Sequence, residues 1–318
     1  MFFLRLKLNK KMNELVTVCI TTFNRKTLLI GALKSVLEQD YHNLEILIVD
    51  DASTDGTKEA LEESYLFKDP RVRYIKHLTN KGLASSRNTA IFNSKGEYFT
   101  FCDDDDRWQI DMVTNLLFVI NRTDEINVSI GVSSKFKGNC LEVYKENTSI
   151  KELMIQGVTP PVSSQMYKVS LLRKIKGYDG EIKSGVDHDL WIRLASVETK
   201  VGIGWDALAL VGNDLNIHRL TANQEKRINN IERSLIHWKK NIVRGFGGEF
   251  YIYFCKEYRE NLIVSFFMIS VKRRQYLRLI KLLFTVAVLK KILLKVNFLS
   301  KYEEKKCGYF KKYYGKII

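Results

Sequence analysis

Four consecutive aspartates, Asp103 to Asp106, are the residues of this sequence that most clearly suggest chemistry. They follow an apolar run and stand shortly before Trp108. Neighbouring like charges repel one another, and a carboxylate beside a protein core is poorly solvated, so a bound cation would offset both costs. Taken alone, the run has two interpretations: a solvated acidic loop, or a cation site made of carboxylate oxygens, which suit Mg²⁺ and Mn²⁺.

Two more polar clusters lie at the ends of apolar, β-branched runs. The run at 15–23 leads into the cluster from Thr21 to Asn24, and the run at 44–49 is followed by Asp50 and Asp51. Stretches with helical spacing of apolar residues separate these runs. The alternation predicts an α/β protein with a doubly wound, mainly parallel sheet and helices on both faces. Ligands bind at the carboxyl ends of such strands, so we expect the three clusters to form one site.

The glycine-rich loops that commonly bind phosphates are missing from the sequence. Neither GxGxxG nor GxxxxGK[ST] occurs in the chain, and these are the loops whose backbone N–H groups cradle the phosphates of a nucleotide. A nucleotide-type sheet without such a loop needs another source of positive charge. We therefore predict a divalent cation, Mn²⁺ or Mg²⁺, held by aspartates.

Composition excludes several classes of protein. The chain has 318 residues, of which 45% are hydrophobic and 27% charged, which is typical of a globular protein with one large or two small domains. Five widely spaced cysteines indicate neither a disulfide framework nor a zinc site. No run approaches the roughly 18 apolar residues of a transmembrane helix, so none is predicted.

Most of the positive charge belongs to the last part of the chain. Residues 272–318 hold fourteen Lys or Arg and two Glu, a net +12 out of the total +15. Their apolar residues recur at helical spacing between lysines, which predicts a helical, basic tail that docks on an anionic membrane surface. An ordinary helix packed on the main domain is the alternative. Nucleic-acid binding is not expected, because no recognition motif accompanies the charge.

Six stretches, in order, resemble the family 2 nucleotide-sugar glycosyltransferases with the GT-A fold. They span Val16 to Ala195, about 60% of the chain, and read VTVCITTFNR, LEILIVDDASTDGT, NKGLASSRNTA, GEYFTFCDDDDRW, KGYDG and VDHDLWIRLA. The resemblance implies the GT-A form of the doubly wound sheet. Taken together with the composition of the chain, it predicts four regions. These are a leader at 1–14, a nucleotide-sugar-binding half at 15–125, an acceptor-binding half with the catalytic base at 126–222, and the helical, basic, membrane-associating region at 223–318.

The resemblance also implies roles for individual residues. Asp103 and Asp105 match the family's DxD metal ligands. The implied nucleotide-sugar contacts are Thr21, Phe23, Asn24, Arg25, Asp51, Arg87, Asp103 and Asp104. Residues expected on the acceptor side, or in support of it, are Asp106, Trp108, Asp189 and Trp191. Many relatives have tyrosine where this chain has Phe23, so one hydroxyl contact is absent.

The resemblance places the catalytic base at Asp187. In the family an aspartate of a Glu-Asp pair opens a helix that reads xxLWxR, and this chain has GVDHDLWIRL, with Val186 in place of the glutamate. An inverting transfer needs such a carboxylate to take the proton of the acceptor hydroxyl. Asp189 is the alternative base, and since residues two apart do not share a helix face, the two aspartates are not expected to act as a close pair.

The expected function is therefore transfer of glucose or galactose from a UDP-sugar to a saccharide on undecaprenyl diphosphate, in a β-1,3 linkage, for O-antigen or capsule repeat units. The expected location is peripheral, on the cytoplasmic face of a bacterial inner membrane. Three alternatives remain: a protein or other cell-surface glycan as acceptor, a relative that only binds nucleotide sugars, and a sugar nucleotidyltransferase. The last would need a glycine-rich loop after the first strand, where this chain has TTFNRKT.

Overall fold

The computed structural model describes residues 13–133, 148–155, 160–211 and 224–259. The first half alternates strands with helices, as the sequence predicts. Its elements are β1 (Val16–Thr22), α2 (Lys26–Leu37), β2 (Leu44–Asp50), α3 (Thr57–Glu63), β3 (Val72–Lys76), α4 (Leu83–Asn93), β4 (Tyr98–Phe101), β5 (Arg107–Trp108) and α5 (Met112–Ile120).

The second half is built from shorter and more varied elements. They are β6 (Ile126–Ser133), β7 (Thr148–Ser149), α6 (Ile150–Ile155), β8 (Gln165–Lys168), α7 (Val169–Lys174), α8 (Val186–Ala195), β9 (Lys200–Leu210) and α9 (Gln224–Phe246). The helix expected to open near Asp187 is therefore α8, and it begins one residue earlier.

The described strands form one sheet in the order β3-β2-β1-β4-β8-β6-β9-β5, with β7 paired to β9. The strands β3, β2, β1 and β4 are parallel, which confirms the predicted arrangement for the first half. Beyond β4 the sheet becomes mixed, because β8 is antiparallel to both β4 and β6 whereas β6 and β9 run parallel. Pairing of Thr22 with Asp50 places the ends of β1 and β2 side by side.

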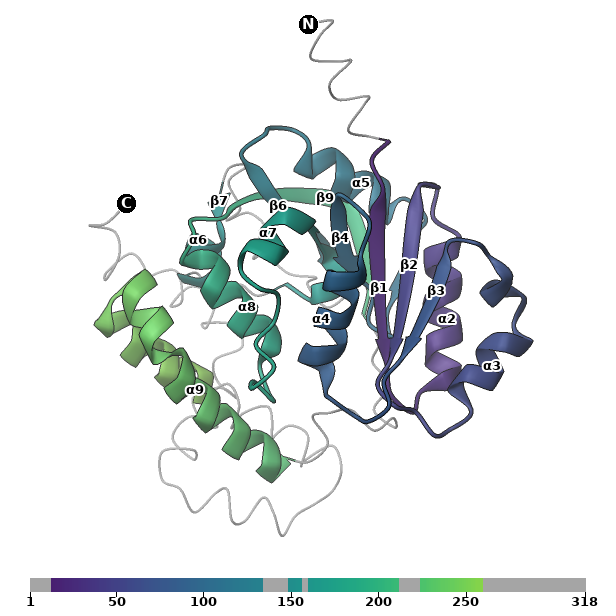
Figure 1. Ribbon diagram of the computed structural model, residues 1–318. Coiled ribbons are helices and arrows are strands. Elements are labelled where there is room, and N and C mark those ends of the chain that lie inside the picture. The colour runs from purple at the N-terminus through teal and green to yellow at the C-terminus, as the bar shows by residue number, and fades with distance from the viewer. Residues whose placement is uncertain (1–12, 134–147, 156–159, 212–223, 260–318) are drawn as a thin grey trace, which may run out of the picture. The chain divides into compact units, whose positions relative to one another are not determined.

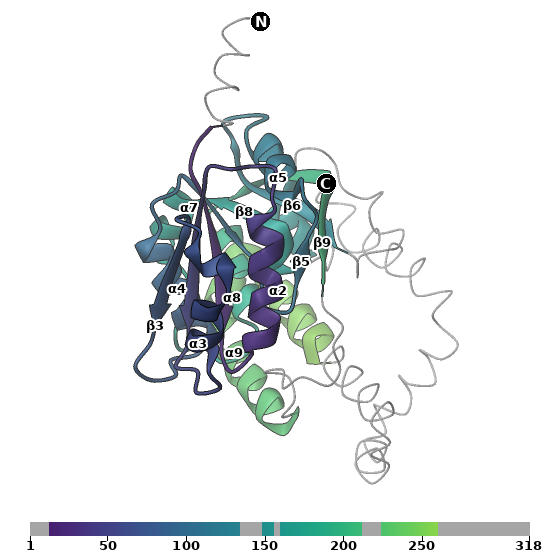
Figure 2. The same ribbon diagram turned by 90° about the vertical axis from the view of Figure 1, so that its right-hand side faces the viewer.

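Helices cover both faces of the parallel strands, again as predicted. Figures 1 and 2 show α4 on one face of these strands and α2 on the other. The apolar residues of α2 that face the sheet recur three and four apart, and Leu29, Leu33 and Val36 are fully buried. They share one core with β1, β2 and α5. The strand ends are thus fixed by packing on both sides of the sheet.

The chain divides into two compact units. Of the described residues, the first unit holds 13–211 and 230–245, and the second holds 224–229 and 246–259. In the second unit Phe246 and Phe250 stack with their ring centroids 4.6 Å apart. The region boundaries predicted at 125/126 and 222/223 stay predictions. The basic tail at 272–318 lies outside the described residues. Among the residues described, none of the helices has the length and apolar character needed to cross a bilayer.

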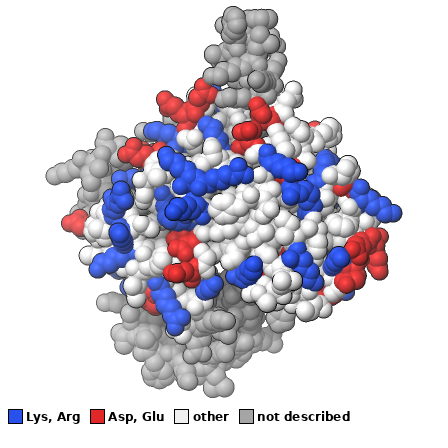
Figure 3. All heavy atoms as spheres, viewed as in Figure 1, with Lys and Arg blue, Asp and Glu red and all other residues white. Residues whose placement is uncertain are grey.

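Charged side chains of both signs occupy the face of the molecule seen in Figure 3. Lysine and arginine stand there in several separate groups, with acidic groups between them and at the right-hand edge. This mixture agrees with a sequence in which residues 1–271 carry only +3 of the total charge of +15.

Candidate active site

A pocket lies where the ends of β1, β2 and β4 meet. Its wall is formed by Thr21, Thr22, Phe23, Arg25, Asp51, Asn80, Gly82, Leu83, Ser86, Asp103, Asp104 and Asp105. Seven of these are residues predicted for the site. The structure does not bring Asn24 or Arg87 to the pocket wall. The predicted pattern, in which polar residues after separate parallel strands converge, is therefore present.

Asp104 is buried under the pocket and is held by two donors. The Thr22 hydroxyl donates to Asp104 Oδ2 at 3.0 Å, and the Arg25 guanidinium donates to Oδ1 at 2.8 Å. Burial raises the pKa of Asp104 to about 6, while Arg25 and Thr22 act in the opposite direction. Arg25 also reaches Asp105, with 4.0 Å between the charged atoms. The two central aspartates thus share one arginine from the start of α2.

Three of the four consecutive aspartates could hold a metal ion. Carboxylate oxygens of Asp103, Asp105 and Asp106 lie within 4.8 Å of one another. Asp103 and Asp105 line the pocket, whereas Asp106 is buried. Such hard oxygen donors fit Mg²⁺ or Mn²⁺, which bind carboxylates together with phosphate oxygens. The acidic run is thus part of the pocket region and is not a solvated loop. Asp106, which was expected on the acceptor side, belongs to the candidate cation cluster.

Asp51 accepts three hydrogen bonds at the end of β2. The backbone N–H groups of Lys81 and Gly82 donate to its two oxygens at 2.8 and 2.7 Å, and His77 Nδ1 lies 2.8 Å from Oδ1. α4 begins directly after Gly82, which has φ +89° and supplies no side chain as a cap. Asp51 therefore holds the two residues that lead into α4 and still faces the pocket.

His77 is a residue of this site that the sequence reasoning did not select. Its Nδ1 carries a proton, because the carboxylate of Asp51 can only accept. Its Nε2 lies 2.9 Å from the hydroxyl of Thr89 on α4. Both ring nitrogens are thus engaged and the ring is buried. Since His77 directly follows β3, the strand-end rule applied to Asp51 could have identified it.

Arg87 connects the aspartate run to Asp187. Its Nη2 donates to Asp103 Oδ1 at 3.0 Å, and its Nη1 donates to Asp187 Oδ1 at 2.5 Å. The guanidinium is 1% exposed and stands 5.2 Å from the ring centroids of both Phe101 and Tyr178. The buried guanidinium of Arg87 therefore joins Asp103, a carboxylate of the candidate metal cluster, to the candidate base Asp187.

Asp187 stands in the first turn of α8, and Gly185, in the left-handed conformation with φ +76°, precedes the helix. Its carboxyl side chain is 35% exposed, so a ligand can reach it. The hydroxyl of Tyr178 lies 3.4 Å from the same Oδ1 that Arg87 contacts. Both contacts thus use one oxygen of the carboxylate.

Asp189, the alternative base, is in a different environment. It is 1% exposed, and burial raises the pKa of its carboxyl group. Arg193 Nε donates to Oδ2 at 2.9 Å and Trp238 Nε1 donates to Oδ1 at 3.0 Å. Both oxygens are therefore occupied by partners within the protein, and the geometry favours Asp187 over Asp189 as the group that meets a substrate.

The two tryptophans expected near an acceptor are buried. Trp191 Nε1 donates to the side-chain oxygen of Gln165 at 2.9 Å. Trp108 Nε1 donates to the carbonyl of Ser163 at 2.8 Å, and the hydroxyl of Ser163 accepts from the backbone N–H of Asp103 at 3.0 Å. Trp108 thus supports the aspartate run from behind, and Trp191 belongs to the core under α8.

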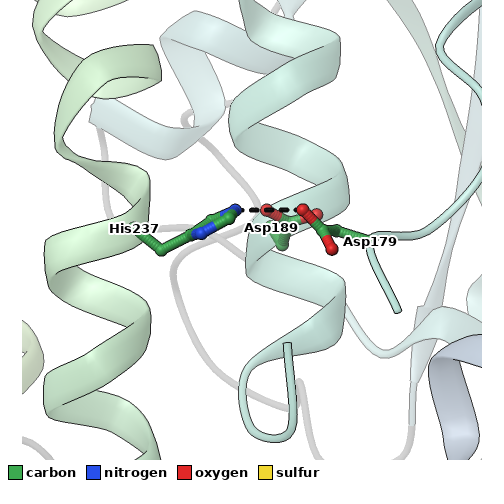
Figure 4. A group of neighbouring side chains, drawn as sticks. All are labelled: Asp179, Asp189 and His237. Carbon is green, nitrogen blue, oxygen red and sulfur yellow. Dashed lines mark hydrogen bonds and ion pairs between the residues drawn. The ribbon is translucent and has the colours of Figure 1, made fainter. Parts of the chain in front are cut away.

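A second group of potential metal ligands is formed by Asp179, Asp189 and His237 (Figure 4). His237 Nε2 lies 2.9 Å from Asp179 Oδ2, so these two residues already satisfy each other. Asp189 is paired with Arg193 and Trp238. A cation would have to displace these partners, and the group is an internal network that joins α9 to α8 and the loop before it.

Comparison with known proteins identifies the family. Residues 17–175 match the sequence profile described as glycosyl transferase family 2, which is half of the chain. The chain belongs to this family. The family 2 match ends before Asp187, so the candidate base and α9 lie beyond the matched residues.

Two similar proteins named as glycosyltransferases come from Escherichia coli. The putative colanic acid biosynthesis glycosyl transferase WcaA of Escherichia coli strain K12 is 31% identical over 194 residues, which is 58% of this chain and 67% of that protein. The UDP-Glc:alpha-D-GlcNAc-diphosphoundecaprenol beta-1,3-glucosyltransferase WfaP of Escherichia coli is 39% identical over 102 residues, 32% of this chain and 39% of that protein. The chain thus spans only part of each relative.

Solved structures confirm the GT-A fold expected for a family 2 enzyme. Staphylococcus aureus TarS 1–349 in complex with UDP-GlcNAc superposes with a TM-score of 0.59 at 18% identity, covering 81% of this chain and 72% of that one. The mannosyltransferase PcManGT of Pyrobaculum calidifontis, in complex with GDP-Man and Mn²⁺, gives a TM-score of 0.56 at 21% identity, covering 71% and 64%. At these identities the likeness establishes the fold.

Proposed function

We propose that the protein transfers glucose or galactose from a UDP-sugar, with inversion, to a saccharide on undecaprenyl diphosphate, forming a β-1,3 linkage in O-antigen or capsule repeat units. The observation that carries the proposal is the bridge made by Arg87, which holds Asp103 of the candidate cation cluster and the candidate base Asp187 with one guanidinium. The name of the relative WfaP supports this choice of donor and acceptor.

The pocket would take the UDP part of the donor. Asp51 can only accept hydrogen bonds, which suits the N3–H of uracil, and Phe23 offers an exposed ring beside it. Thr21, Arg25 and Asp104 line the pocket where ribose and phosphates would lie. Asp103 and Asp105, with Asp106 behind them, would hold Mn²⁺ or Mg²⁺. When bound, the cation supplies the charge that stabilises the diphosphate as leaving group.

The transfer itself needs a base on the acceptor side. Asp187 takes the proton of the acceptor hydroxyl while that oxygen attacks the anomeric carbon of the sugar, and the bond from this carbon to the phosphate oxygen breaks to release UDP. Arg87 and Tyr178 contact Oδ1 of Asp187. We therefore assign Oδ2 as the oxygen that receives the proton, and Arg87 as the group that fixes the direction of the carboxylate.

A lipid-linked acceptor would bring the enzyme to a membrane. The basic residues of 272–318 would bind the anionic, cytoplasmic surface peripherally, at roughly 1 kcal/mol for each basic residue near it. Flotation with anionic and neutral liposomes tests this: the full-length protein should float with anionic vesicles at low salt and be released by high salt. A version that ends at Val271 should stay at the bottom, and equal flotation of both versions would contradict the proposal.

The proposed reaction is tested with purified protein, Mn²⁺, a panel of UDP-glucose, UDP-galactose and GDP-mannose, and synthetic polyprenyl-diphosphate-linked GlcNAc. We expect a disaccharide product from one UDP-sugar, with a β anomeric proton coupling by NMR, and product formation slower by about 10²-fold or more with Asp187→Asn. Transfer from GDP-mannose alone would overturn the donor assignment. An α product would overturn the inverting mechanism.

A further inference from the structure

The part of α9 between residues 230 and 245 lies against the segment that carries Asp187. Its inner face is marked by Ile231, Leu235, Trp238 and Ile242, which recur three or four residues apart and are at most 1% exposed. The match to the family 2 profile ends at residue 175, so nothing in that match assigns a role to this helix. Its packing must therefore be interpreted from its own contacts.

Three side chains of α9 make hydrogen bonds to the segment 179–189. The Ser234 hydroxyl donates to the carbonyl of Ser184 at 3.1 Å, His237 pairs with Asp179, and Trp238 Nε1 donates to Asp189. Figure 4 shows His237 pointing from α9 toward both aspartates. The ring of Trp238 also stacks on His188, with 6.5 Å between centroids and 28° between planes. Contacts thus fall on both sides of Asp187 in the sequence.

The other side of the same segment is held by α4. Asn88 of α4 binds both the backbone N–H and the carbonyl of Tyr178, each at 2.7 Å, and Arg87 holds the Asp187 carboxylate. The chain from 178 to 189 therefore runs between two helices, and each of them contacts it through side chains of its own. α4 fixes the carboxylate end of Asp187, whereas α9 fixes the backbone from which the side chain leaves.

We propose that α9 is a positioning element for the catalytic base, with Trp238 as its central residue. The proposal rests on the proposed function, in which Asp187 is that base. Trp238 satisfies one oxygen of the buried Asp189 and fills the space beside His188, so its removal leaves a buried carboxylate oxygen without its donor. The first turn of α8 then loses its fixed place, and a displaced base loses rate.

The decisive variant is Trp238→Phe, which keeps a ring and deletes the N–H. Trp205→Phe is the matched control, because Trp205 is 43% exposed on β9 and lies outside the proposed site. Three quantities are measured: turnover of UDP-glucose with polyprenyl-diphosphate-linked GlcNAc and Mn²⁺, the Kd of UDP with Mn²⁺ by calorimetry, and hydrogen exchange of peptides that cover 178–190. Asp187→Asn is measured alongside.

For Trp238→Phe we expect kcat to fall about 10-fold or more, with the Kd of UDP unchanged, because the donor pocket is built from other elements. Amides of 178–190 should exchange about 10-fold faster, as for the loss of one buried hydrogen bond, while peptides from β1 and β2 keep their protection. Trp205→Phe should match the unmodified protein in all three measurements. A merely structural role would lower protection and UDP affinity together.

Ser234→Ala serves if Trp238→Phe does not fold, since it removes one hydroxyl and keeps the helix. Unchanged exchange in 178–190 would overturn the proposal regardless of the reaction. Faster exchange with unchanged kcat, in a protein that Asp187→Asn inactivates, would also overturn it. Full turnover of Asp187→Asn itself would remove the base assignment of the proposed function, a failure that the exchange data distinguish from failure of the contact between α9 and α8.

Discussion

The donor pocket and the segment that carries Asp187 are positioned in different ways. In the pocket, functional side chains directly follow strands whose places are fixed by a parallel ladder, so that β1 and β2 end side by side. Asp187 instead opens a helix after a long connection, and side chains from α4 and α9 hold that connection. Sheet register thus fixes the positions of the pocket side chains, whereas contacts between residues distant in sequence fix the position of Asp187.

This difference decides which substitutions stay local. A change in the pocket should affect the binding of UDP and cation while leaving the base in place. A change in the contacts around α8 should affect turnover while leaving UDP binding intact. Arg87 is the exception, because it belongs to both regions.

The largest effect is expected for Asp105→Ala. This change removes a carboxylate of the candidate cation cluster at the pocket wall, and we expect transfer to be abolished. Turnover with excess Mn²⁺ is the measurement, and chelation of the unmodified protein with EDTA should have the same result. Asp206→Ala, at an exposed aspartate of β9, is the control. Full activity in EDTA, with no tightly held metal, would contradict the prediction.

Arg87→Met should impair both regions at once, because Arg87 contacts Asp103 in the pocket and the candidate base Asp187. It removes the buried guanidinium that Asp103 and Asp187 share, while their own side chains, 37% and 35% exposed, remain partly solvated. We therefore expect a loss of about 1–3 kcal/mol, the scale of lost hydrogen bonds to a charged group. Urea unfolding should show this loss, and both UDP affinity and turnover should fall. Arg122→Met, at an arginine beside the exposed ring of Phe118, should cost far less. If UDP affinity stays unchanged, Arg87 serves the base alone.

Asp187→Asn should separate the two regions. The amide is nearly isosteric with the carboxylate but cannot take a proton, so we expect kcat to fall by about 10²-fold or more. The Kd of UDP with Mn²⁺ should stay the same, because the pocket wall does not include this residue. Loss of UDP binding together with rate would mean that Asp187 has a structural role.

The smallest effect is expected at His77, behind the pocket. In His77→Asn the amide nitrogen takes the place of Nδ1 and keeps the hydrogen bond to Asp51, whereas in His77→Gln it takes the place of Nε2 and meets Thr89. We expect UDP affinity to stay within about 3-fold for the Asn variant and to fall about 10-fold for the Gln variant. Calorimetry measures both, and equal losses would show that the ring acts only by filling space.

The sequence was most informative where local rules apply. Alternating apolar runs and helical spacing predicted β1, β2 and β4 with helices between them, and the strand-end rule brought Asp51 and Asp103 to one pocket. The mixed direction of β8 was not predicted, because a short run such as QMYK carries no sign of which way it runs. The position of a site residue can therefore be predicted from sequence when the residue lies within a few positions of a strand end.

Arg87 and Trp238 show why the remainder could not be predicted. Helical spacing tells which face of α4 carries Arg87, but the two carboxylates that it joins are 16 and 100 positions away in the sequence. Trp238 reads as an ordinary core residue of an amphipathic helix, and only the fold reveals that its N–H meets Asp189, 49 positions earlier. Pairings over such separations depend on the whole fold.

The hydrogen bonds from Lys81 and Gly82 to Asp51 have a consequence for protein engineering. Asp51 both selects a nucleobase, in the proposed function, and holds the backbone of the two residues that lead into α4. Redesign of the enzyme for a different nucleotide would begin with this carboxylate, and the same substitution would loosen α4, from which Arg87 reaches the base. A successful redesign would therefore need another acceptor for the N–H groups of Lys81 and Gly82 before the specificity of the pocket could change without loss of rate. That acceptor would have to come from a neighbouring element, because Gly82 has φ +89° and a side chain at this position would strain the backbone.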